Sequence, residues 1–96
     1  MKRPDKDEMT AMKDALYHEL AAGTIGIREA TRRMRRILGM TQRDYAGEIA
    51  GISPRILSEF ENGSGNPTLA TLEKIASPFG LQVTFLPPES WRMKGT

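Results

Sequence analysis

Apolar residues recur three or four positions apart along much of this chain, and this spacing predicts a mainly helical protein. Residues 5–22 are expected to form an amphipathic helix whose apolar stripe consists of Met9, Met12, Leu16 and Leu20. After a break at residues 23–26, a second helix over residues 27–38 should bury Ile27, Ala30, Met34, Ile37 and Leu38. A later helix begins after Thr68, ends near Pro78 and should bury Leu69, Leu72, Ile75 and Ala76.

Two shorter helices joined by a tight turn are expected between Thr41 and Gly63. Thr41 is a good N-cap residue, and Gly51 can take the positive φ that ends a helix. Ser53 then caps the next helix, and Pro54 suits its first position because no N–H bond is lost there. With so short a connection the helices must cross steeply. This arrangement is typical of a helix-turn-helix motif, whose second helix can enter the major groove of DNA.

A short strand is expected near the C-terminal end, before Pro87 and Pro88. The apolar residues that alternate with polar ones there are Leu81, Val83 and Phe85. A single strand has no partner within the chain, and an unpaired apolar strand invites edge pairing. We therefore expect it to pair with the same strand of a second subunit and to form a homodimer. The alternative is a C-terminal extension that packs back on its own domain.

Positive charge is concentrated in the middle of the chain, although the net charge is only +2. Between residues 28 and 55 the acidic residues are Glu29, Asp44 and Glu48. The arginines of the same stretch are Arg28, Arg32, Arg33, Arg35, Arg36, Arg43 and Arg55. A basic patch on the expected motif fits contact with nucleic-acid phosphates. The alternative is a solvated helix face.

Composition narrows the class of protein further. A chain of 96 residues allows one domain with a modest core, and the lack of cysteine excludes disulfides and cysteine-bound zinc. No apolar run approaches the roughly 20 residues that span a bilayer, and no signal-peptide core is present, so we expect a cytoplasmic protein without a membrane partner. His18 is the single histidine and lacks a suggestive Ser or Cys partner. We therefore expect no enzyme activity, cofactor or metal.

The region from about residue 27 to residue 80 matches a known pattern. The matching positions are Met34-Arg35, Gly39-Met40-Thr41-Gln42, Tyr45-Ala46, Gly51-Ile52-Ser53, Leu57-Ser58-Glu59-Phe60-Glu61-Asn62-Gly63, Asn66-Pro67-Thr68 and Leu72-Glu73-Lys74-Ile75-Ala76. On these residues the chain resembles the Xre, or phage-repressor and Cro-like, helix-turn-helix family. The resemblance implies an all-α, lambda-repressor-like domain of four to five helices at residues 27–80. An N-terminal helical extension at residues 1–26 and a dimerising strand and tail at residues 81–96 complete the expected organisation.

The resemblance also implies roles for individual residues. Base contacts fall to Ser53, Pro54, Arg55, Ser58 and Glu59. Arg55 is the strongest candidate because arginine pairs bidentately with guanine O6 and N7, and the alternative for it is a phosphate contact. Pro54 departs from the polar side chain common at its position and cannot hydrogen-bond a base.

Further family roles concern the DNA backbone and the interior of the domain. Backbone contacts fall to Gln42, Arg43, Asn62 and Thr68. For Gln42, Asn62 and Thr68 the alternative is capping or turn formation. Arg35 and Glu61 match a pair that forms a partly buried salt bridge in the family.

The implied function is sequence-specific regulation of transcription. The chain resembles HipB-like antitoxins in Phe60-Glu61-Asn62 and in the expected strand. This implies a dimeric repressor of its own operon, bound to a palindromic operator in double-stranded DNA, and an antitoxin role that would add a toxin protein as a partner. The alternative is a protein-interaction module that works through the N-terminal helix and the tail, with weak or partner-dependent DNA binding.

Overall fold

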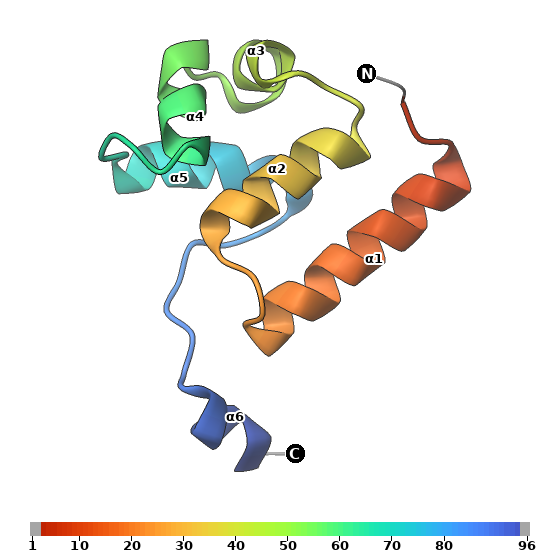
Figure 1. Cartoon of the computed structure of the whole chain (residues 1–96), viewed down its shortest axis with the longest axis vertical. Coiled ribbons are helices and arrows are strands. Elements are labelled where there is room, and N and C mark those ends of the chain that lie inside the picture. Colours follow the sequence, from red (N-terminus) through yellow and green to blue (C-terminus); the bar gives the residue numbers. More distant parts are fainter. Residues whose placement is uncertain (1–2, 95–96) are drawn as a thin grey trace.

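The computed structural model describes residues 3–94, and the regular elements of this range are all helical (Figure 1). In chain order they are α1 (Lys6–Ala22), α2 (Ile27–Ile37), α3 (Gln42–Asp44), η1 (Tyr45–Ala50), α4 (Pro54–Glu61), α5 (Leu69–Ala76), η2 (Ser77–Phe79) and α6 (Glu89–Lys94). The π-helical turn η1 continues α3, so that α3 and η1 together form the first helix of the expected motif. None of the helices in residues 3–94 is long and apolar enough to cross a membrane.

Local capping explains where the helices begin. The Asp5 side chain accepts the Glu8 N–H while the Glu8 side chain accepts the Asp5 N–H, so a complete capping box starts α1. Thr41 accepts the Asp44 N–H at the start of α3, and Ser53 accepts the Arg55 N–H at the start of α4. These polar contacts involve residues two or three positions apart, which is why the sequence predicted the boundaries closely.

The core lies where α1, α2, η1, α4 and α5 meet. Its largest fully buried side chains include Tyr45, Phe60, Leu16, Ile37 and Leu57. Because Leu16 comes from α1, the N-terminal helix is an integral part of the packed core. The hydroxyl of Tyr45 donates to the Ile75 carbonyl at 2.8 Å, which satisfies a buried polar group. The Tyr17 hydroxyl of α1 donates to the Phe79 carbonyl at 2.6 Å and ties α1 to the end of the α5–η2 segment.

The predicted C-terminal strand is wrong. In the described range no strand forms, and Leu81, Val83 and Phe85 lie in an extended segment that leads away from the body of the domain (Figure 1). Leu81 packs partly buried against the core, whereas the Phe85 side chain is 98% exposed. A strand exists only when its main chain pairs with a neighbouring strand, and no other segment of residues 3–94 supplies one.

The tail beyond Pro88 forms the short helix α6, an element that the sequence pattern did not predict. The Pro88 carbonyl accepts the N–H groups of Trp91 and Arg92 at 3.0 and 3.1 Å, so the proline carbonyl starts the helix. The Arg92 guanidinium donates to the Ala22 carbonyl at 2.9 Å and thereby links α6 to the end of α1. We refer to residues 81–94 as the C-terminal arm.

Candidate nucleic-acid interface

The two helices of the motif present one exposed face and one buried face. On α4 the buried side consists of Leu57, Phe60 and Glu61. The candidate base-contacting residues share the other side, where Ser53, Pro54 and Arg55 are exposed and Ser58 and Glu59 are partly exposed. The structure therefore places Ser53, Pro54 and Arg55 at the exposed N-terminal end of α4, while Ser58 and Glu59 lie one turn further along the helix.

Arg55 and Glu59 form an ion pair on this face. The Arg55 Nε lies 2.9 Å from Glu59 Oε1, four residues further along the helix, and the two side chains are 85% and 40% exposed. Exposed pairs of this kind contribute little stability, so Arg55 can exchange its carboxylate for another acceptor at small cost. The Ser53 hydroxyl oxygen is already used as an N-cap acceptor.

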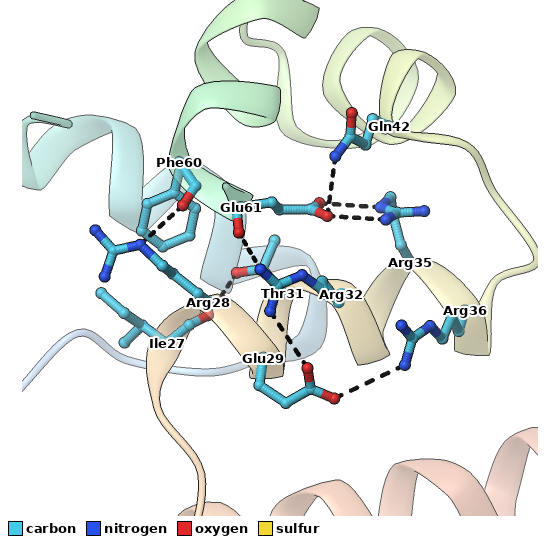
Figure 2. A network of polar contacts seen from close by, with 10 residues as sticks. All are labelled: Ile27, Arg28, Glu29, Thr31, Arg32, Arg35, Arg36, Gln42, Phe60 and Glu61. Carbon is cyan, nitrogen blue, oxygen red and sulfur yellow. Dashed lines mark hydrogen bonds and ion pairs between the residues drawn. The ribbon is translucent and has the colours of Figure 1, made fainter. Parts of the chain in front are cut away.

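Behind this face lies a buried polar network around Glu61 (Figure 2). Arg35 of α2 donates two hydrogen bonds to the Glu61 carboxylate, from Nε to Oε2 at 2.9 Å and from Nη2 to Oε1 at 2.8 Å. Gln42 of α3 donates its side-chain amide to Glu61 Oε1 at 3.1 Å. One carboxylate of α4 therefore joins α2, α3 and α4.

The pKa of Glu61 lies below its ordinary value as a result of opposing influences. Burial disfavours the charged carboxylate, but the hydrogen bonds from Arg35 and Gln42 and the positive charges of Arg35 and Arg32 outweigh that penalty. The ionised form is therefore the one the folded domain holds.

The candidate backbone-contacting residues occupy different environments. The Gln42 amide points to Glu61 instead of solvent, a contact that sequence reasoning missed because it joins residues 19 positions apart. Arg43 is exposed on α3, and Asn62 is exposed at the C-cap of α4. The Thr68 hydroxyl accepts the Thr71 N–H at 3.1 Å and so caps α5.

Much of the arginine-rich face of α2 is engaged inside the protein. Arg28 Nε donates to the Phe60 carbonyl at 2.9 Å, Arg32 donates to the Glu61 carbonyl, and Arg35 binds the Glu61 carboxylate (Figure 2). Sequence reasoning treated Arg28 and Arg32 only as part of a basic patch, whereas for Arg35 the family resemblance also implied the salt bridge to Glu61. Their spacing of four and then three residues was the available signal, since it places all three on one face of a helix.

Comparisons with known proteins agree with this geometry. A steeply packed pair of short helices, joined by a turn and followed by a supporting helix, defines a helix-turn-helix domain. The family model described as "Helix-turn-helix" matches residues 32–86, more than half of the chain. The chain belongs to this helix-turn-helix family, as its resemblance to the Xre type indicated.

One curated relative is the HTH-type transcriptional regulator DdrOP3 of Deinococcus deserti, which is 42% identical over 55 residues. The matched region is 57% of this chain but only 42% of that protein. No solved structure matches the chain.

Proposed function

We propose that the protein is a sequence-specific DNA-binding regulator of transcription that represses its own operon. The observation that carries the proposal is the outward face of α4, where an 85% exposed Arg55 stands on a helix whose other side is buried. Membership of the helix-turn-helix family and the likeness to a named transcriptional regulator support it. Repression is steric, because a protein seated on the operator excludes polymerase.

Base recognition in this proposal depends on Arg55. Its guanidinium leaves Glu59 and donates two hydrogen bonds to guanine O6 and N7 in the major groove. Glu59, once released, accepts from a cytosine amino group, and Ser58 reaches a base or a phosphate. Pro54 and Ser53 line the groove at the start of α4, where Pro54 supplies van der Waals contact alone.

Backbone contacts position α4 in the groove. Arg43, Asn62 and Thr68 are exposed around the motif and supply them. Gln42 joins them only after its amide exchanges Glu61 for a phosphate. We expect neutralisation of phosphates to make binding strongly salt-dependent, because bound counterions are released.

A two-fold dimer places two copies of α4 about one DNA turn, roughly 34 Å, apart on a palindromic operator. We propose that the copies associate through side chains of the C-terminal arm. Phe85 is 98% exposed and Val83 is 37% exposed, and an apolar surface of this kind gains from burial against a second copy. In this organisation residues 27–80 bind DNA, with residues 1–26 as a helical extension and residues 81–96 as the dimerising part.

The test is selection of duplexes from a random 20-base-pair library by the purified protein, followed by fluorescence anisotropy. The enriched sequence is the selected duplex, and a scrambled sequence of equal composition is the shuffled duplex. We expect tight binding to the selected duplex, at least a hundredfold weaker binding to the shuffled one at physiological salt, and a steep salt slope. Failure to enrich any sequence would refute the regulator proposal.

A second candidate function is binding of a partner protein, such as the toxin of a toxin–antitoxin pair. An apolar groove of about 470 Å³ lies between α1, α2, α5 and the start of the arm. Further along the arm Trp91 is 62% exposed and Met93 is 73% exposed. The test is co-expression with the product of the neighbouring gene: a stable complex that Trp91→Ser weakens supports this function, and separate elution argues against it.

A further inference from the structure

The C-terminal end of α4 is held by arginines from another helix. Helix α4 has only eight residues, and the last carbonyls of any helix lack partners within it. Arg28 Nε donates to the Phe60 carbonyl at 2.9 Å, and Arg32 donates to the Glu61 carbonyl (Figure 2). Cations near a helix C-terminus also interact favourably with its dipole.

We propose that Arg28 and Arg32 are positioning residues that set the direction of α4 through its main-chain carbonyls, and so determine sequence specificity without touching DNA. The inference rests on the proposed DNA-binding function. It assigns these two arginines a role distinct from the phosphate contact expected of a basic patch. It also differs from the role of Arg35, which holds the Glu61 side chain.

The surroundings of Arg28 favour positioning over phosphate binding. Its guanidinium lies 5.3 Å from the centre of the Phe60 ring, and Phe60 is only 1% exposed. The side chain is therefore partly buried between the ring and the carbonyl of one residue. A lysine cannot reproduce this arrangement, because its ammonium lacks a planar face to stack on the ring while an N–H donates sideways.

The surroundings of Arg32 lead to the same conclusion. Its Nη1 lies 3.3 Å from the Glu29 carboxylate, while Nη2 donates to the Glu61 carbonyl. The guanidinium is thus shared between an acidic neighbour and the helix end. Displacement by a phosphate would leave the Glu61 carbonyl and the Glu29 carboxylate without this donor.

Because α4 is held at its C-terminal end, a small change in its direction displaces the residues at its N-terminal end. Eight residues span about 12 Å at 1.5 Å per residue, with the two carbonyls at one end and Ser53–Arg55 at the other. A tilt of about 5° at the held end displaces the base-reading end by about 1 Å, which is enough to spoil bidentate hydrogen bonds. The arginines therefore influence base recognition from the end of the helix that lies away from the bases.

The test uses Arg28→Met and Arg32→Met, which keep the apolar stem but remove the donor, in the full-length chain. Arg43→Met, an exposed residue of the proposed backbone contacts, is the matched phosphate control. The probes are the selected and shuffled duplexes, measured by anisotropy over a range of salt concentrations. Thermal unfolding is followed for every variant, and binding is measured well below the lowest transition.

For Arg28→Met and Arg32→Met we expect about tenfold weaker binding to the selected duplex, equivalent to about 1.4 kcal/mol. Binding to the shuffled duplex and the salt slope stay at wild-type values. Arg43→Met should instead weaken binding to both duplexes and reduce the slope by about 1. If Arg28→Met and Arg32→Met behave like Arg43→Met, they contact phosphates and the proposal is overturned. A lower unfolding temperature with an unchanged ratio of the two affinities also overturns it, because the two arginines would then stabilise the fold without affecting sequence specificity.

Hydrogen exchange of the free protein separates this inference from the function it rests on. The amides of Asn62, Gly63 and Ser64 bond to the Ser58, Phe60 and Glu59 carbonyls, so they report on the end of α4. Loss of the Arg28 donor should raise their exchange rates about tenfold while α5 amides keep theirs. If wild type enriches no duplex, the regulator proposal fails, while this measurement still reports whether Arg28 and Arg32 hold the end of α4. Unchanged exchange at these amides would refute the positioning role.

Discussion

Arg35 and Glu61 meet through two parallel hydrogen bonds of 2.9 and 2.8 Å, and the carboxylate is 1% exposed. Arg35 comes from α2 and Glu61 from the last turn of α4, so this pair connects α4, the second helix of the motif, to α2. Gln42 adds a third helix to the same carboxylate. The network makes the stability of the domain and the placement of α4 depend on one buried charge.

Glu61→Gln should lower the free energy of unfolding by about 3 kcal/mol, because the substitution leaves the largely buried Arg35 without its counter-charge. Urea denaturation measures the loss, with Glu48→Gln at an exposed position as the control. The double variant Arg35→Met/Glu61→Leu should recover much of the loss, since apolar residues remove both charges. A loss below about 1 kcal/mol for Glu61→Gln would show that the pair contributes no more than a surface ion pair.

The stabilisation by Glu61 should depend on pH. Because the folded pKa is depressed below the ordinary value of about 4.3, the stabilising effect is present above that value and is lost as pH falls through the lower folded pKa. The difference in unfolding free energy between wild type and Glu61→Gln should stay constant from about pH 8 to 5 and shrink below about pH 4. Urea denaturation at a series of pH values tests this. A difference that grows on acidification would contradict the assigned direction.

Tyr45→Phe should cost about 1–2 kcal/mol, because it leaves the buried Ile75 carbonyl without its donor at 2.8 Å. Burial also raises the pKa of Tyr45 to about 12, so its ionisation should be absent from the ultraviolet titration until strongly alkaline pH. Tyr17→Phe, whose hydroxyl bonds the Phe79 carbonyl from a half-buried site, is the comparison variant. Equal stability of Tyr45→Phe and wild type in urea would mean that the hydroxyl bond adds nothing net.

Arg55→Ala should lose about 1–3 kcal/mol on the selected duplex and much less on the shuffled one, as expected for a base contact. Stability should stay close to that of wild type, because the Arg55–Glu59 pair is exposed. Anisotropy on both duplexes gives the measurement. An equal loss on both would assign Arg55 to a phosphate.

Phe85→Lys should convert the proposed dimer to a monomer without lowering the free energy of unfolding of each subunit, since the side chain is 98% exposed in the single chain. Sedimentation velocity measures the oligomeric state, and Lys13→Ala at an exposed site of α1 serves as the control. If Phe85→Lys and wild type sediment alike as dimers, the arm is not the interface.

The helices of the domain were predictable because their signals are local. Capping by Thr41, Ser53 and Thr68 acts over two or three residues, and the structure places these residues as N-caps. The expected strand failed for the opposite reason. Its alternating pattern describes side chains, whereas a strand needs main-chain partners that residues 3–94 do not offer it.

The sequence by itself determined the helices from α1 to α5 and their caps, because periodicity and short-range hydrogen bonds depend on residues only a few positions apart. Its motif residues indicated the family. Apart from the Arg35–Glu61 pair, which the family resemblance implied, only the tertiary structure decided which distant polar groups meet. Gln42 reaches Glu61 across 19 positions, and Arg28 reaches the Phe60 carbonyl across 32. Such contacts depend on how helices pack, and packing directs Arg28 and Arg32 of α2 toward the end of α4 instead of toward solvent.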